Sequence, residues 1–182
     1  MPGRLMRQLR GLPPFRSTGS NLVASFTTPD LSDLYPDAGL LPYQFRQFGL
    51  RERFAGPVST VSCYLDNSRV AEAVAEQGGG RVLLVDGRGA LERSLLGDRL
   101  AQLASSNEWA GVVVIGAIRD VEVIDAIDIG VQALGVCPVK TNKQGAGERD
   151  VPLRLGETHI SPGHWLYADR NGVLISASSI HN

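Results

Sequence analysis

Cysteine is scarce in this 182-residue sequence, which has only Cys63 and Cys137, and these two lie far apart. Isolated thiols form neither a disulfide framework nor a CxxC metal site, and they are typical of buried side chains in a reducing cytoplasm, where we expect the protein. No apolar run approaches the roughly 20 residues of a membrane-spanning helix, so we expect no membrane association. The formal net charge is −1 and aromatic residues make up 6%, which argues against direct nucleic-acid binding.

Three common functional-site patterns are also missing. His159, His164 and His181 show no metal-ligand spacing, and no Cys–His or Ser–His pair suggests a hydrolase nucleophile. Residues 87–92 have the outline of a dinucleotide-binding turn, but Glu92 stands in place of the third glycine, where its charge would repel a pyrophosphate. We therefore expect neither zinc chemistry nor a nucleotide site.

The first 26 residues differ in charge from the rest of the chain. They contain no acidic residue, and their arginines are Arg4, Arg7, Arg10 and Arg16. The absence of an apolar segment argues against a secretory signal, while an organelle transit peptide, an over-extended start and a disordered arm all stay open. We expect residues 1–26 to be a disordered basic extension and residues 27–182 to be the folded domain.

Hydrophobic periodicity and turn residues predict alternating strands and helices, followed by consecutive strands. Helices are expected at 28–35, at 70–77, in two pieces between Leu91 and Ala104 that Gly97 separates, and at 121–127. Strands are expected at 58–64, 81–86, 112–118, 151–155, 158–160, 165–168 and 173–175, with a further apolar run at 129–136 and a polar loop at 140–147. This order predicts a single α/β domain with more than one layer of sheet.

The strand at 112–118 is wholly apolar and ends directly in Arg119 and Asp120. Charge at the end of a buried strand is costly unless it is paired or meets a ligand. One interpretation is a carboxylate that holds a divalent cation beside a guanidinium that binds an anionic substrate. The other is a salt bridge at the strand end. If a metal binds, oxygen ligation at Asp120 favours Mg²⁺ or Mn²⁺.

Residues Gly97, Asp98, Arg99 and Leu100 form a second candidate site. If a helix begins here, its first backbone amides lack intrahelical partners and can receive a carboxylate. Asp98 is either the cap of that helix or an acid that orients a water molecule.

Several short segments in a fixed order resemble one known family. They are Phe45–Gly49, Phe54–Pro57, Asp66–Asn67, Val85–Gly87, Leu96–Asp98, Gly116–Asp120, Asp128–Gly130, Gly145–Glu148 and Tyr167–Gly172. From about Thr28 to about Ser176, the sequence is similar to regulator of ribonuclease activity A (RraA) and to the class II 4-hydroxy-4-methyl-2-oxoglutarate aldolases.

The resemblance implies a swivelling β/β/α layered sandwich, assembled as a homotrimer with active sites at subunit interfaces. It assigns the divalent metal to Asp120, substrate contact to Arg119, and further substrate contacts to Gly97, Asp98, Arg99 and Leu100. Arg119 and Asp98 would then be the catalytic residues. The implied reaction is retro-aldol cleavage of a 4-hydroxy-2-oxo acid to release pyruvate, with decarboxylation of oxaloacetate as a second activity.

A non-catalytic role is the alternative that this resemblance implies. In it, the protein binds the endoribonuclease RNase E or a related assembly and restrains RNA processing through protein contacts. Some regulator-type members replace the Asp after the Arg, whereas this chain keeps Asp120, which favours the lyase. Longer aldolases also carry a C-terminal Glu that reaches a neighbouring subunit, and we expect this chain, which stops at Asn182, to lack it.

Overall fold

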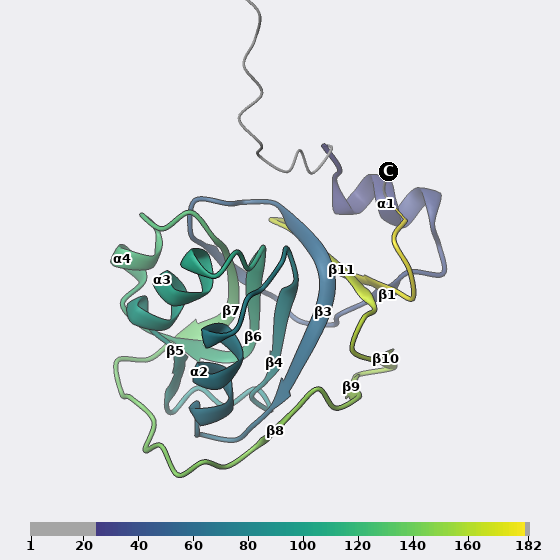
Figure 1. The fold of residues 1–182 in the computed structure, drawn as a ribbon. Helices are drawn as coiled ribbons and strands as arrows, with labels where there is room; N and C mark the ends of the chain where they lie inside the picture. The colour runs from purple at the N-terminus through teal and green to yellow at the C-terminus, as the bar shows by residue number, and fades with distance from the viewer. Residues whose placement is uncertain (1–24, 181–182) are drawn as a thin grey trace, which may run out of the picture.

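The computed structural model describes residues 25–180, and strands outnumber helices in it (Figure 1). In chain order the elements are α1 (Thr28–Leu34), β1 (Gly39–Leu40), β2 (Arg46–Phe48), β3 (Phe54–Ser62), α2 (Ser68–Ala75), β4 (Val82–Asp86), β5 (Ser94–Leu96), α3 (Asp98–Ser106), β6 (Gly111–Ile118), α4 (Val121–Ile124), β7 (Gly130–Val136), β8 (Glu148–Arg149), β9 (Leu153–Leu155), β10 (Thr158–Ile160), β11 (Trp165–Asp169) and β12 (Gly172–Ser176). No helix in this part of the chain is long and apolar enough to cross a membrane.

The predicted basic extension lies almost entirely outside the described residues. Only its last two positions, Ser25 and Phe26, are described, and the Phe26 ring packs edge-on against Tyr167 with 5.4 Å between ring centroids. His181 also lies outside the described part.

The long strand β3 joins two groups of strands. Its first residues pair antiparallel with β11, and the residues from Val58 onward pair parallel with β4. The strand order is β1-β12-β11-β3-β4-β6-β7-β2, with β5 beside β6 and β8 beside β3. Strand β3 is therefore shared by two parts of one continuous sheet: its antiparallel pairing with β11 joins it to one part, and its parallel pairing with β4 joins it to the other.

The parallel strands are buried on both faces, because helices pack on one face and a second layer of strands packs on the other. One face packs under α2, α3 and α4, which gather on one side of the strands in Figure 1, and the residues that it buries include Leu83, Val85, Val112 and Val114. The other face packs against β9 to β12 and buries Val82, Leu84, Val113 and Ile115. The two layers of strands and one of helices confirm the predicted single-domain, layered β/β/α architecture of the α/β class.

Part of the predicted helix pair between Leu91 and Ala104 is wrong. Residues 94–96 form the strand β5, and only the second piece is helical, as α3. Leu95 and Leu96 are both buried, because β5 pairs with β6 at the edge of the parallel sheet and is covered there. In the sequence, Leu95, Leu96, Leu100 and Leu103 have the spacing of one helix face, which is why a helix was predicted on both sides of Gly97.

The strand predicted at 58–64 begins earlier than expected. β3 starts at Phe54 and runs through Gly56 and Pro57, because β11 pairs with residues 54–57. Pro57 stands where the strand exchanges its β11 partner for β4, so its missing N–H falls at the change of ladder. The helix expected at 121–127 is also shorter, since α4 ends at Ile124.

Candidate functional site

The pairing of β5 with β6 brings the two candidate motifs together. Leu96 is the register partner of Ile118, and the backbone N–H of Arg119 donates to the Leu96 carbonyl at 2.9 Å. Because β5 and β6 run parallel, the segments that follow them leave the sheet at the same edge, where the carboxyl ends of both strands lie. Gly97 and Asp98 therefore emerge beside Arg119 and Asp120, although about 20 residues separate them in sequence.

Gly97 is the point of closest approach between the two motifs. A Cβ atom there would lie 3.0 Å from Asp120 Oδ2 and 3.3 Å from Arg119 Nε. Its backbone is extended, with φ −130°, so a side chain there would cause no backbone strain but would crowd the Arg119 and Asp120 side chains. Glycine thus lets the carboxylate and the guanidinium approach the backbone of the first turn of α3.

Arg119 and Asp120 form an ion pair, with Arg119 Nε 3.2 Å from Asp120 Oδ2. The side chains keep 36% and 39% of their accessible surface, so the pair is not sealed. Asp120 adopts a left-handed backbone conformation, φ 56°, in the step from β6 into α4. A non-glycine residue in that region is uncommon, although Asp adopts it more readily than most residues do.

The first turn of α3 presents backbone amides beside this pair. Gly97 occupies the capping position and offers no side chain, so the helix begins without a capping oxygen from that residue. Asp98 lies in the first turn, and its carboxylate accepts a hydrogen bond from the Arg99 N–H at 2.7 Å. Asp98 is therefore not the capping residue itself.

A cleft of about 640 Å³ opens at this edge of the sheet. Its lining residues are Asn67, Ser94, Gly97, Asp98, Arg99, Leu100, Leu103, Arg119, Lys140, Thr141, Asn142 and Lys143. All of the predicted substrate-contact residues line it, whereas the predicted metal ligand Asp120 does not, although its Oδ2 lies close to Gly97, which does. Four of the lining side chains are cationic and one is acidic, so the cleft suits an anionic ligand.

The wall formed by residues 140–143 was not predicted as part of the site. Lys140 pairs with Ser94 of β5, and the Thr141 hydroxyl donates to Asn67 Oδ1 at 2.7 Å. Sequence periodicity cannot find such contacts, because they join segments more than 40 residues apart. The signal that could have found them is the pair of lysines, Lys140 and Lys143, in an otherwise uncharged polar loop.

The residues fit a hard cation held by one protein carboxylate better than a closed metal centre. Among residues 25–180, no group of three His, Cys, Asp or Glu side chains is placed to hold a metal. Asp120 is partly exposed and pairs with Arg119, which lines the cleft, so water and substrate oxygens could complete the coordination of a cation bound to it. Mg²⁺ is commonly bound in this way, through one or two carboxylates and a substrate.

The two cysteines do not offer an alternative nucleophile. Both are free and buried. Burial, with additional repulsion from Asp86 and Asp66, raises the pKa of the Cys63 thiol to about 12. Because the thiolate is the reactive form, Cys63 stays inert at neutral pH.

Comparison with known proteins identifies the family of this chain. The family described as RraA-like: Aldolase/RraA matches residues 28–175. A protein of Ectopseudomonas mendocina, provisionally named 4-hydroxy-4-methyl-2-oxoglutarate aldolase, is 48% identical over 85% of this chain and 96% of its own length.

Two solved structures share the fold over nearly their whole length. The RNA-processing inhibitor RraA from a Thermus species is 46% identical, with a TM-score of 0.82 over 85% of this chain and 94% of that one. A structure from Geobacillus kaustophilus, named as an S-adenosylmethionine: 2-dimethylmenaquinone methyltransferase, is 42% identical, with a TM-score of 0.83 over 85% of this chain and 97% of that one. The chain therefore belongs to the RraA-like family, which the aldolases and RraA share.

Proposed function

We propose that the protein is a divalent-metal-dependent lyase that cleaves 4-hydroxy-4-methyl-2-oxoglutarate and related 2-oxo acids to release pyruvate, and that it also decarboxylates oxaloacetate. The observation that carries the proposal is the meeting of Gly97 and Asp98 with Arg119 and Asp120 at the mouth of a cationic cleft. The aldolase names of the sequence relatives support the same reaction class.

In the proposed reaction, the residues of the cleft orient a substrate that carries two carboxylates. Arg119 binds the 2-oxo acid end, and the amides at the start of α3 receive a carboxylate oxygen, because the first amides of a helix have no backbone acceptor within it. The Arg99 N–H would exchange its bond to the Asp98 carboxylate for one to the substrate. Lys140 and Lys143 supply positive charge for the distal carboxylate. These contacts hold the bond to be broken in a fixed orientation.

Cleavage of the carbon–carbon bond leaves its electron pair on the pyruvate fragment as an enolate. In the retro-aldol reaction the 4-hydroxyl loses its proton as the second carbonyl forms, and in the decarboxylation the leaving fragment is CO₂. Asp98 accepts or returns protons through a water molecule, and Arg119 stabilises the developing oxyanion as a fixed cation. A divalent cation held by Asp120 would add positive charge beside the same oxygen.

A coupled assay for pyruvate tests this proposal directly. We expect turnover of oxaloacetate and of 4-hydroxy-4-methyl-2-oxoglutarate with Mg²⁺, and loss of both on addition of EDTA. Asp120→Asn keeps the size of the side chain but removes its charge, and we expect turnover to fall about a hundredfold or more. Absence of turnover in the wild-type protein with either Mg²⁺ or Mn²⁺ would refute the proposal.

A second candidate function is favoured by the name of a structural relative. The Thermus protein of the same fold, 46% identical, is named as an RNA-processing inhibitor. A protein partner of the RNase E type would then be bound by an outer surface rather than by the cleft. Calorimetric titration against purified RNase E tests it, and Asp120→Asn should bind as the wild type does if the two functions use different surfaces.

We also propose that the chain assembles as a homotrimer in the cytoplasm. Apolar side chains are exposed on segments that flank the cleft, namely Leu103, Val123, Val136 and Val139. A neighbouring subunit would cover them and bring further groups to the cleft, which is open in one chain. The free, buried thiols suit a reducing compartment.

A further inference from the structure

The lysine-bearing wall of the cleft is a loop with little structure of its own. Residues 141–147 form neither helix nor strand, and all of them except Thr141 are exposed. At its start the loop is tied to β5, because Arg93 donates to the Lys140 carbonyl at 2.8 Å. A loop held only at that end would sample many conformations, and its lysines would lose their fixed positions.

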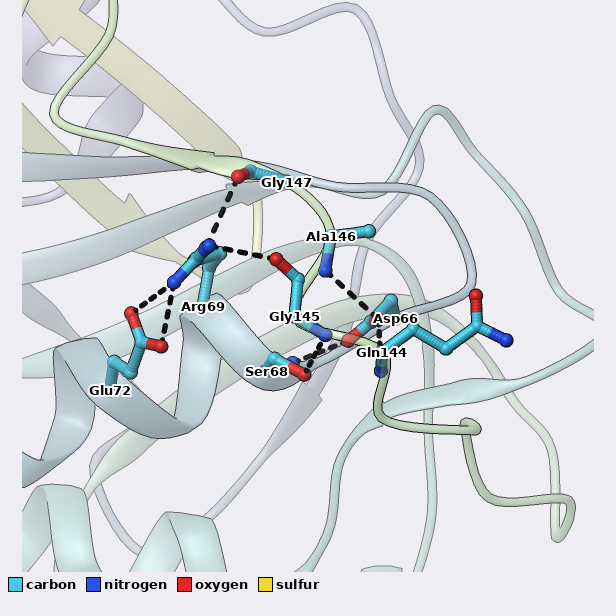
Figure 2. Close-up of polar contacts among 8 residues, drawn as sticks. All are labelled: Asp66, Ser68, Arg69, Glu72, Gln144, Gly145, Ala146 and Gly147. Atoms are coloured by element: carbon cyan, nitrogen blue, oxygen red, sulfur yellow. Dashed lines mark hydrogen bonds and ion pairs between the residues drawn. The ribbon is translucent and has the colours of Figure 1, made fainter.

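The far end of the loop is tied to the start of α2 by Asp66 and Ser68 (Figure 2). Asp66 Oδ2 accepts the backbone N–H groups of Gln144 at 2.7 Å and of Ala146 at 3.2 Å. The Gly145 N–H donates to the Ser68 hydroxyl at 3.1 Å. Three successive amides of the loop thus find their acceptors in one short segment.

Arg69 holds the carbonyl side of the same loop. Its guanidinium donates to the Gly145 carbonyl at 2.8 Å and to the Gly147 carbonyl at 3.2 Å, while Glu72 binds a third guanidinium nitrogen at 2.7 Å (Figure 2). The planar fork of arginine suits three acceptors in fixed directions, which a lysine cannot match.

The intervening residue, Asn67, connects the two walls of the cleft. Its side chain accepts from the Thr141 hydroxyl and donates to the Leu95 carbonyl of β5 at 3.2 Å. Residues 66–69 therefore contact the lysine loop and also the strand that leads into Gly97.

We propose that Asp66 and Arg69 are positioning residues that hold the 140–147 loop against the start of α2 and so fix Lys140 and Lys143 opposite Arg119 in the cleft. The inference rests on the proposed function, because it assumes that the lysines meet an anionic substrate. Neither residue lines the cleft, so each would act on a bound ligand indirectly, through the segments that it holds.

Arg69→Met is the sharpest variant, since it keeps the aliphatic stem on the surface of α2 and removes the bonds to both carbonyls. Glu72→Gln is the matched control, because Glu72 contacts Arg69 but not the loop. Arg69→Lys restores the charge without the fork. Each full-length variant is compared with the wild type by hydrogen exchange of the peptide covering residues 140–148, by calorimetric titration with oxalate and Mg²⁺, and by the kinetics of pyruvate release from oxaloacetate.

In Arg69→Met we expect exchange in residues 140–148 to be about tenfold faster, with unchanged exchange in β4 and β6. Oxalate should bind about three- to tenfold more weakly and KM should rise by a similar factor, whereas kcat changes less, because Arg119 and Asp98 stay in place. The exchange rate, oxalate affinity and KM of Arg69→Lys should lie between those of the wild type and Arg69→Met. Those of Glu72→Gln should match the wild type.

Unchanged exchange in Arg69→Met would overturn the role in holding the loop. Faster exchange with unchanged oxalate affinity and KM would overturn the positioning role, as would an equal effect in Glu72→Gln. Failure of the proposed function gives a different result: the wild type then releases no pyruvate, while the exchange and oxalate measurements still report on the loop. If the wild type binds no oxalate, the anionic-ligand assumption shared by both proposals is refuted.

Discussion

At the scale of single residues, the site depends on the absence of a side chain at Gly97. The residue joins β5 to α3 and faces the ion pair of Arg119 and Asp120 with no side chain between them. The ion pair itself is the strand-end salt bridge that the sequence left open as an alternative. It does not exclude a role in binding, because both side chains stay partly exposed and Arg119 lines the cleft.

Gly97→Ala tests this directly, because its methyl group would lie 3.0 Å from Asp120 Oδ2. We expect kcat/KM for oxaloacetate to fall about tenfold or more as the pair is displaced. The extended backbone accepts alanine, so the free energy of unfolding should change by less than about 1 kcal/mol. Steady-state kinetics and urea unfolding of the same sample measure the two effects. A large loss of stability would show instead that Gly97 serves the fold.

At the scale of elements, most strands and helices were predictable because their sequence patterns are local. The apolar strand β6, the helix α1 and the late strands β9 to β12 all follow from periodicity and turn residues. The short strands β1, β2 and β8 have two or three residues each, too few for any period, and exist only because distant partners complete them.

The candidate site shows the same division between local and distant information. Gly97 to Leu100 and Arg119 to Asp120 were found as motifs, because each is a short run with a clear chemical pattern. Their closeness comes from the β5–β6 pairing, which the sequence concealed behind the helical spacing of Leu95 and Leu100. The lysine loop lies at the cleft because Lys140 pairs with Ser94 in a backbone β-bridge and the Thr141 hydroxyl donates to Asn67, and no local pattern predicts either contact.

The ionisation of Asp66 makes the stability of the contact between α2 and the 140–147 loop depend on pH. Burial would raise the pKa of this carboxyl group, but hydrogen bonds from Ser68, Gln144 and Ala146 outweigh it and lower the pKa to about 2. Since the folded-state pKa is below the unfolded value of about 3.9, ionised Asp66 stabilises the fold above about pH 4. This contribution is lost as the pH falls through about 2.

Asp66→Asn should therefore be about 2 kcal/mol less stable than the wild type at neutral pH. The difference should shrink as the pH falls from about 4 toward 2, because the wild-type carboxyl group becomes protonated. Urea unfolding of both proteins at matched concentration, at several pH values, measures this. A difference that stays constant to pH 2 would show that the charge of Asp66 is not what holds the loop.

At the scale of the whole molecule, β3 determines how the layers stack. It pairs with β11 through its first residues and with β4 through its last, so the second layer is continuous with the parallel sheet. Gln132 of β7 adds a polar link across the core: its amide donates to the Asp169 carbonyl of β11 at 2.6 Å. The cleft at the edge of β5 and β6 is thereby built on strands that are fixed from both faces, which suits a site that must hold charges in place.

Exposed apolar side chains on α4 are candidates for the interface of the proposed trimer. Val123 is 52% exposed on α4, the helix that follows Asp120, whereas Leu34 on α1 is 71% exposed and lies on a helix that contacts β11 and β12. We expect Val123→Arg to lower the molar mass measured by light scattering from trimer toward monomer, because burying an unpaired charge in an interface costs several kcal/mol.

Leu34→Arg adds the same charge at a more exposed position and should leave the mass unchanged. If the neighbouring subunit completes the cleft, pyruvate release by Val123→Arg should fall together with the trimer fraction and recover at higher protein concentration. Full activity in a monomeric Val123→Arg would show that one chain carries the whole site. An unchanged trimer would instead remove α4 from the interface.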